Sequence, residues 1–399
     1  MSLLLVEVQG AEREIALLED NRLVDYHRSA DAGSIRPEEI YIGRVSRVMK
    51  NLQAAFVRLA DKVDGFLPFA QIPSGNIPQP GDSLLVQVKK PPLPGKAAYL
   101  TMDISLTGTL AILTPCRPGS RVSRRVGGEE DRRRLLRLAR QLVPQDMSLV
   151  LREDSLHAGE DALRTEVAQL LARWQDIGER AAHLSPPAVV EQAPDALQRL
   201  LRDLHEVPER VLTNDPAALG DIGLPVTQAA HPMQLHEVHH KLQRALRRKV
   251  QLKSGASLVI DPCEAMTVID VNTAQNIEGK NRDRALLKTN LEAAGEIARL
   301  LRLRRMGGII LIDFIDMVSS QDREEVLIAL RDALNRDPVK TVVHGFTQLG
   351  LVEMTRKKAD EPLASERLIP CPRCRGTGFA QRPSEDTQPP HKEEPDDAP

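Results

Sequence analysis

Two aspartates at the ends of apolar runs are the residues whose placement first points to chemistry. Asp270 lies in the run Thr267-Val-Ile-Asp-Val-Asn272, and Asp313 ends the run Gly308-Ile-Ile-Leu-Ile-Asp313. Short β-branched runs bounded by Gly or Pro are typical of buried strands. A carboxylate where such a strand meets solvent is costly unless it is paired, hydrogen-bonded or bound to a cation. Asp270 and Asp313 are therefore candidates for one shared metal ion.

The segments around this pair predict the elements that must position it. Residues 257–261 form a further strand-like run, and residues 284–305 show helical spacing. The apolar positions of that spacing are Leu287, Leu291, Ala294, Ile297 and Leu301. The pattern predicts a hairpin, a crossover helix and a third strand. A second amphipathic helix is expected to begin at Ser319 or Ser320, whose hydroxyls are suitable helix caps.

Two cysteines near the C-terminal end have the spacing of half a zinc site. Cys371 and Cys374 are followed by Gly-Thr-Gly, and such glycines free backbone N–H groups to face thiolates. Two thiolates do not complete a tetrahedron, and Cys116 and Cys263 are isolated, so a second copy of the chain is the simplest donor of the other pair. A redox Cys-x-x-Cys is the alternative. The glycines and the absence of a thioredoxin-like context favour zinc.

Residues 37 to 107 contain about five short strand-like runs separated by Gly, Pro and Asn, which suits a small OB-type barrel. Phe56, Phe66, Phe69 and Tyr41 fall in this segment among basic residues. Exposed rings beside cations form a stacking platform for single-stranded nucleic acid. The alternative is that the rings belong to the barrel core. We favour the core for Phe69 and leave both interpretations open for the other three.

Two further segments have a clear periodicity. Residues 3–28 alternate like a small β-hairpin that is too short to fold alone, so it must pack against another part of the chain. Residues 160–182 have the spacing of a helix, and Trp174 on its apolar face is expected in the core. Residues 185–235 are punctuated by prolines and less clearly patterned, so we assign no regular structure to them.

Composition and charge narrow the class of protein. The 399 residues suffice for two or more domains, and the formal net charge is -2. Residues 382–399 hold six acidic residues against Arg382 and Lys392, so the rest of the chain is slightly basic. No uncharged run approaches the length of a membrane span, and the N-terminus does not resemble a secretory signal. With four cysteines, a cytoplasmic location is expected.

Two short polar motifs admit a functional and a structural interpretation. A basic run from Lys241 to Lys253 could contact phosphates, but a solvated helix face is the more usual explanation. The run His236-Glu-Val-His-His240 matches the zinc pattern His-Glu-x-x-His. No third ligand is evident near it, so we interpret it as a polar helix surface.

Taken together, the motifs resemble the catalytic region of the ribonuclease E/G endoribonucleases. The resemblance extends from about Met1 to Gly378 and is strongest over residues 250–378. Its most specific marks are Ile269-Asp-Val-Asn272, Thr289-Asn-Leu-Glu-Ala-Ala294, Leu301-Arg-Leu-Arg304, Gly307-Gly308, Ile312-Asp-Phe-Ile-Asp-Met317, Leu349-Gly-Leu-Val-Glu-Met-Thr-Arg356 and Cys371-Pro-Arg-Cys374.

The resemblance implies an α+β multidomain protein. An S1-type OB-fold barrel would be inserted into an RNase H-like domain, followed by a DNase I-like catalytic subdomain and a zinc-link motif. The expected boundaries are 1–36 and 185–247 for the RNase H-like parts, 37–107 for the barrel, 108–184 for a 5′-sensor-like segment, 248–367 for the catalytic subdomain, 368–379 for the zinc link and 380–399 for a disordered acidic tail.

The resemblance also assigns roles to single residues. Asp270 and Asp313 match the magnesium ligands and Asn272 the asparagine that supports them. The barrel positions implicated in gripping RNA are Phe56, Phe66 and Lys96, and Cys371 and Cys374 match a zinc link between two protomers. Arg152 falls in the 5′-monophosphate pocket motif, but Glu153 stands where a threonine is expected. That departure places an acid beside a phosphate site.

The implied activity is magnesium-dependent cleavage of single-stranded RNA in RNA processing or decay, leaving 5′-phosphate and 3′-hydroxyl ends. A homodimer linked by zinc is expected, because Cys371 and Cys374 match the zinc link between two protomers. The resemblance is to a short form that lacks a C-terminal small domain, so a tetramer does not follow. The alternatives are a non-catalytic RNA-binding or assembly protein on the same scaffold, and a nuclease acting on DNA.

Overall fold

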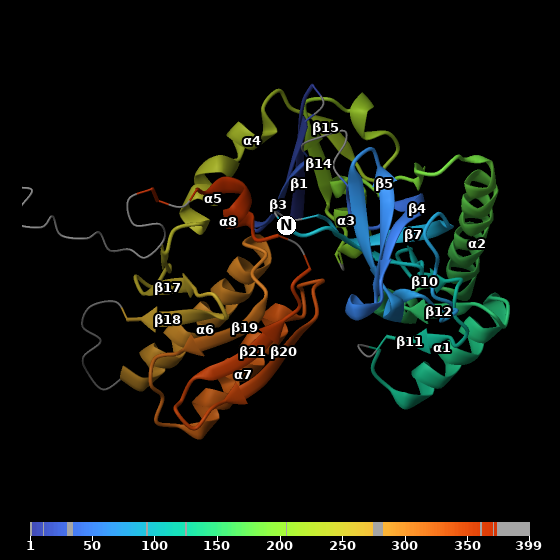
Figure 1. The fold of residues 1–399 in the computed structure, drawn as a ribbon. Helices are drawn as coiled ribbons and strands as arrows, with labels where there is room; N and C mark the ends of the chain where they lie inside the picture. Colours follow the sequence, from blue (N-terminus) through green and yellow to red (C-terminus); the bar gives the residue numbers. More distant parts are fainter. Residues whose placement is uncertain are drawn as a thin grey trace, which may run out of the picture. The chain divides into compact units, whose positions relative to one another are not determined.

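The computed structural model describes residues 2–10, 12–29, 35–92, 95–123, 126–204, 206–273, 282–359, 361–369 and 371–372. The chain divides into two compact units, residues 1–241 and 242–399. Both helices and sheets are present in each, which confirms the α+β class (Figure 1). Within the described residues, no helix is long and apolar enough to cross a membrane.

The first sheet of unit 1 joins segments that lie about 200 residues apart in the sequence. Its strand order is β15-β14-β1-β2-β3, and β1 pairs in parallel with β14 (Figure 1). The strands are β1 (Ser2–Gln9), β2 (Glu12–Glu19), β3 (Arg22–Ser29), β14 (Arg210–Thr213) and β15 (Val226–Gln228). The expectation that the N-terminal hairpin packs against another part of the chain is therefore confirmed, with three strands in place of two. The short helices after the barrel are α3 (Ala196–Asp203), α4 (Pro232–Leu235) and α5 (Val238–Ala245).

Five strands inserted between β3 and β14 close into a barrel. Their order is β4-β5-β6-β8-β7, and β7 pairs back onto β4, so the predicted OB-like barrel is confirmed. The strands are β4 (Ile40–Met49), β5 (Ala54–Ala60), β6 (Val63–Pro68), β7 (Ser83–Lys90) and β8 (Ala98–Thr101). Glycine is required at Gly43, because a Cβ there would lie 2.4 Å from Cγ1 of Val57. Strand β13 (Ala188–Glu191) extends the barrel sheet beside β4.

A four-stranded sheet and two helices follow the barrel. The order is β11-β12-β10-β9, and the helices supply the apolar side chains that cover it. The elements are β9 (Leu106–Thr107), β10 (Ala111–Thr114), β11 (Arg121–Val122), β12 (Ser148–Leu151), α1 (Glu129–Leu142) and α2 (Glu160–His183). Helix α2 confirms the helix predicted over 160–182. Trp174 is half-buried and packs against this core, as expected.

Unit 2 is a six-stranded sheet in the order β16-β17-β18-β19-β21-β20 (Figure 1). Its strands are β16 (Lys249–Gln251), β17 (Ser257–Pro262), β18 (Met266–Asn272), β19 (Gly308–Asp313), β20 (Thr341–Phe346) and β21 (Val352–Arg356). Its helices are α6 (Arg282–Leu303), α7 (Ser320–Leu334) and α8 (Leu363–Arg367). The predicted hairpin, crossover helix and third strand are β17–β18, α6 and β19. Strand β19 runs parallel to β18, as a helical crossover requires.

Burial alternates along the strands of unit 2. Ile269, Ile310 and Ile312 are fully buried, whereas their chain neighbours on the other face are partly or largely exposed. Successive side chains of a strand point to opposite faces, so one face carries the apolar core and the other is open. Helix α7 begins after Ser319, whose hydroxyl accepts hydrogen bonds from the N–H groups of Gln321 and Asp322, so the predicted cap is confirmed.

A buried ion pair anchors β21, which lies between β19 and β20 in this sheet. The Arg356 guanidinium donates to both oxygens of Asp337, at 2.7 and 3.1 Å, and to the carbonyl of Met306 at 2.8 Å. Both side chains of the pair are nearly inaccessible to solvent. Removing one member of such a pair leaves a buried charge without its counterion.

We predict that Arg356→Met lowers the free energy of unfolding by about 3–5 kcal/mol, because it leaves the Asp337 carboxylate uncompensated. Urea denaturation at neutral pH measures this. The matched control is Arg331→Met, which removes an exposed ion pair with Glu324 and should change stability by less than about 1 kcal/mol. Equal effects of the two substitutions would contradict the account.

Candidate active site

The structure brings Asp270 and Asp313 together on neighbouring parallel strands. They are direct partners in the register between β18 and β19. Neighbouring strands lie about 4.8 Å apart, and paired positions point to the same face. Asp270 is half-buried and Asp313 is exposed on the open face of the sheet. The two carboxylates therefore share one site, although they are 43 positions apart in the sequence.

The surroundings of this pair disfavour two ionised carboxylates without a counterion. The pKa of Asp313 is raised, first by partial burial and then by the negative charges of Asp270 and Asp316. A raised carboxyl pKa means that the ionised form is disfavoured in this surrounding. A bound cation would relieve both causes, because it supplies the opposite charge and replaces lost hydration. The site is thus suited to a cation by its charge as well as its geometry.

Asn272 fixes the orientation of one carboxylate. Its Nδ2 donates a hydrogen bond of 2.6 Å to Oδ2 of Asp270. The bond leaves the other lone pairs of Asp270 available to a ligand. No cluster of three or more His, Cys, Asp or Glu side chains suited to a metal occurs in the part of the chain that the structure describes. The donors on offer are two carboxylates, which fits magnesium, an ion that takes oxygen ligands and keeps several waters.

Asn290 supports the site in a way that the sequence did not predict, although it lies in the motif Thr289-Asn-Leu-Glu-Ala-Ala294. It projects from α6, is fully buried, and bonds both backbone groups of Ile315. Its Nδ2 donates to the Ile315 carbonyl at 2.8 Å, and its Oδ1 accepts from the Ile315 N–H at 3.1 Å. Asn290 thereby clamps the chain between Asp313 and Asp316. Only the helical periodicity, which faces this polar residue inward, could have signalled the role.

Aromatic and basic side chains form a row across the barrel. The rings of Phe56 and Phe66 meet edge to face at 5.7 Å, and Phe66 lies 6.3 Å from Tyr99. The Arg47 guanidinium lies 4.3 Å from the Phe56 ring centroid, and the Lys90 ammonium 5.9 Å from that of Tyr99. All five are successive partners in the strand register. Tyr99 and Lys90 were not predicted.

The half-buried state of Phe56 and Phe66 favours the surface interpretation over the core. Tyr41 and Phe69 differ, since both pack in the barrel core, with Tyr41 only 5% exposed. The Tyr41 hydroxyl donates to Glu39, and burial together with this bond raises the Tyr41 pKa well above its usual range. Lys96 is exposed just before β8. We call Arg47, Phe56, Phe66, Tyr99 and Lys90 the barrel row.

Arg152 is engaged inside the protein. One guanidinium nitrogen donates to the carbonyl of Gly108 at 2.9 Å and to Asp203 at 3.1 Å. Glu153 follows directly and begins the 3-10 helix Glu153–Leu156. An external phosphate would have to compete with Asp203 for the same cation.

The cysteines are placed only in part. Cys371 is exposed at the end of the described residues, whereas Cys374 and the tail from 380 to 399 lie outside them. Cys116 packs against the core that follows the barrel, where burial raises the pKa of its thiol. Cys263 is exposed in the turn between β17 and β18.

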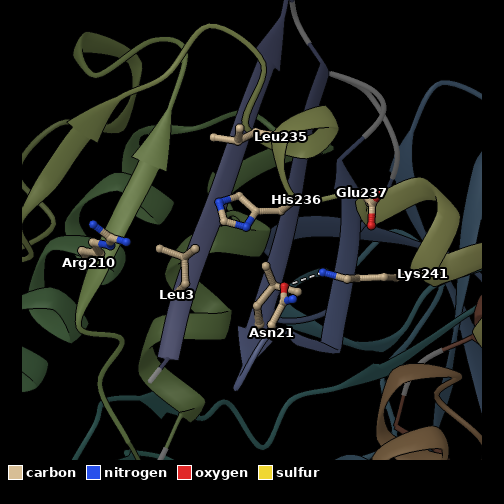
Figure 2. Close-up of a pocket in the computed structure, with 8 residues that line it drawn as sticks. Leu3, Asn21, Arg210, Leu235, His236, Glu237 and Lys241 are labelled. Atoms are coloured by element: carbon tan, nitrogen blue, oxygen red, sulfur yellow. Dashed lines mark hydrogen bonds between the residues drawn. The ribbon is translucent and has the colours of Figure 1, made fainter.

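The His-Glu-x-x-His run does not form one helix face. His236 ends α4, Glu237 has a positive φ of 51°, and His240 lies in α5. In Figure 2 the His236 ring lies between Arg210 and Lys241 in a pocket of about 460 Å³. Burial, followed by the charges of those two cations, lowers the His236 pKa. The run therefore lacks the continuous helix that both the zinc pattern and the predicted polar helix surface require.

We predict that Asn290→Leu increases amide hydrogen exchange at Ile315 by at least about tenfold and lowers the free energy of unfolding by about 1–3 kcal/mol, because buried backbone groups lose their partner. Exchange mass spectrometry measures the first effect. The control Thr289→Val removes only a bond to the carbonyl of Ala285 within α6 and should leave Ile315 protected. Unchanged exchange in Asn290→Leu would refute the clamp.

Comparison with known proteins gives an independent assignment. A sequence model of the Ribonuclease E/G family matches residues 105–359. Ribonuclease G of Escherichia coli K12 is 35% identical over 94% of this chain and 83% of the relative, and that of Haemophilus influenzae gives the same figures. Ribonuclease E of Synechocystis is 33% identical over 87% of this chain and 56% of the relative. Together with the paired aspartates and the closed barrel, these similarities show that the chain belongs to the ribonuclease E/G family.

Proposed function

We propose that the chain is an endoribonuclease that cleaves single-stranded RNA with magnesium and leaves 5′-phosphate and 3′-hydroxyl ends, in RNA processing or decay. The activity class follows from family membership. The observation that carries the mechanism is the register pairing of Asp270 with Asp313 on an open sheet face. It places two carboxylates, one with a raised pKa, where a phosphodiester can reach them.

Asp270 and Asp313 would hold the magnesium ion, and the hydrogen bond from Asn272 would fix the orientation of the Asp270 carboxylate. When bound, such an ion neutralises charge on the phosphoryl oxygens and lowers the pKa of a coordinated water. Asn290 holds the chain that follows Asp313, so that this carboxylate stays at the end of its strand. Preorganised ligands of this kind avoid reorganisation during the reaction.

The barrel row would grip the RNA. Three rings flanked by Arg47 and Lys90 offer successive bases a stacking surface and the backbone two cations. Phe56, Phe66 and the exposed Lys96 are the contacts that the family resemblance implies, and Tyr99 extends them. Arg152 would contact an RNA 5′ end from beside Asp203, with which it already pairs, and the neighbouring Glu153 places an acid at that phosphate site.

The finer fold assignments belong to this proposal. An RNase H-like domain would consist of residues 1–36 and 185–247, and the S1-type barrel, residues 37–107, would be inserted between these two parts of the sequence. The pairing of β1 with β14 supports that interruption. Residues 108–184 would form the 5′-sensor-like segment and residues 248–367 the DNase I-like catalytic subdomain. The protein would work in the cytoplasm.

We predict that Asp270→Asn and Asp313→Asn each lower cleavage of a labelled single-stranded RNA by about a thousandfold or more, while circular dichroism and RNA binding stay unchanged. Asp261→Asn is the control, because that carboxylate lies on the same open face but pairs with Arg248. It should retain activity within about threefold.

Three outcomes would contradict this proposal. Full cleavage by both Asp270→Asn and Asp313→Asn would show that neither carboxylate is required for the reaction. Binding without magnesium-dependent cleavage by the unmodified chain would favour a non-catalytic RNA-binding protein. Equal cleavage of an all-deoxy strand would favour a DNA nuclease.

We further propose that Cys371 and Cys374 (zinc link, residues 368–379) share one zinc ion with the same pair of a second protomer. Thiolates are the preferred ligands of structural zinc, and one chain supplies only two here. We predict that Cys371→Ser lowers bound zinc, measured by mass spectrometry of metals, from about one ion per two chains to near zero, and converts the dimer to monomer in light scattering. Cys263→Ser is the control. A zinc-free dimer in the unmodified protein would contradict the link.

A further inference from the structure

The open face of the unit 2 sheet carries more than the aspartates. Side chains of direct strand partners share a face, so the register maps the neighbours of Asp270 and Asp313 without ambiguity. One step back along the strands, Val268 of β18 pairs with Leu311 of β19, and Leu311 pairs with Glu353 of β21. These positions lie about 7 Å from the aspartates, two residues along the same strands.

The open-face positions two residues further back along the strands complete an apolar patch. Met266 pairs with Ile309, Ile309 with Thr355 of β21, and Thr355 with Val342 of β20. Val268, Ile309 and Val342 are 36%, 48% and 41% exposed. The open-face patch is defined as Met266, Val268, Ile309, Leu311 and Val342. Isolated exposed apolar residues need no explanation, but neighbouring ones mark an interaction surface, and here only Thr355 lies between Ile309 and Val342.

A cation lies on the other side of the aspartates. Lys249 of β16 pairs with Val259 of β17, and Val259 pairs with Asp270. Lys249 is exposed, and two strand spacings place it about 10 Å from Asp270. A row of Lys249, Asp270 and Asp313 therefore crosses the sheet, with the open-face patch along one side of it.

We propose that unpaired bases of the RNA substrate rest on the open-face patch while the sugar-phosphate backbone follows the row from Lys249 to the aspartates. The inference rests on the proposed function and deepens it. The patch continues directly from the carboxylates, so a protein docked on it would obstruct the phosphodiester. Bases offer flat apolar faces to the patch, and phosphates offer negative charge to Lys249.

The arrangement accounts for a requirement for single strands. In a duplex the bases are stacked and paired, so their faces cannot reach Ile309 or Val342. The aspartates repel a polyanion until a cation binds, so affinity must come from contacts that flank them. The open-face patch supplies an apolar contact back along the strands from the aspartates, and Lys249 supplies an electrostatic contact two strands across the sheet.

The first test is Ile309→Thr combined with Val342→Thr, which keeps β-branching and removes apolar surface. On a single-stranded RNA with one cleavage position, we expect KM to rise about tenfold, with kcat within about threefold. The control Ile328→Thr changes a residue of α7 that is 50% exposed and lies outside the patch. It should leave KM unchanged.

The second test is Lys249→Gln. Each phosphate contact contributes about 0.7 to the slope of log affinity against log salt for single strands, so the slope measured with Asp270→Asn as background should fall by about 0.7. Lys253→Gln removes the same charge in the β16–β17 turn, outside the row, and should leave the slope unchanged.

The outcomes separate this inference from the function on which it rests. If the unmodified protein does not cleave RNA, the proposed function fails. If it cleaves and neither the paired Thr variant nor Lys249→Gln alters KM or the salt slope, the inference alone is overturned. If the paired Thr variant instead changes the mass in solution with KM unaffected, the patch is an interface between copies, which also overturns it.

Discussion

Mutual repulsion between two carboxylates on adjacent strands is the constraint on which the rest of unit 2 depends. Asp270 and Asp313 are held in register by a parallel ladder whose other face is fully packed, so neither can move away without breaking the sheet. The pKa of Asp313 is raised first by its partial burial and then by the negative charges of Asp270 and Asp316. A protein keeps such an arrangement at a cost in stability, which is characteristic of sites that bind a cation or perform chemistry.

Buried hydrogen bonds hold the segments around the two aspartates in place. Asn290 reaches from the crossover helix to clamp the chain after Asp313, and Arg356 ties the neighbouring strand to Asp337. Both act through buried hydrogen bonds, which are strong because water cannot compete for them. The open face is free of such ties among the described residues near the aspartates, apart from the bond of Asn272 to Asp270 and the pair of Arg248 with Asp261. The packed face thus supports the face that carries Asp270 and Asp313.

Sequence reasoning predicted the elements of this site better than their detailed contacts. β-Branched runs and helical spacing suffice to predict β17, β18, β19 and α6, because both periodicities are local. Pairing is not local, so β14 as the partner of the N-terminal strands could not be predicted from residues 185–235, which have little regular pattern. The same limit applies to Tyr99 and Lys90, which join the barrel row only through register. The ion pair of Arg152 with Asp203 likewise depends on a contact across 51 positions.

The central claim is that Asp270 and Asp313 hold one divalent cation between them. Electron paramagnetic resonance of Mn²⁺, which shares the oxygen preference of magnesium, counts ions bound to the chain directly and independently of cleavage. The account predicts about one Mn²⁺ per chain that magnesium displaces, and its loss in either Asp270→Asn or Asp313→Asn. The same Mn²⁺ stoichiometry and affinity in both variants as in the unmodified protein would contradict it.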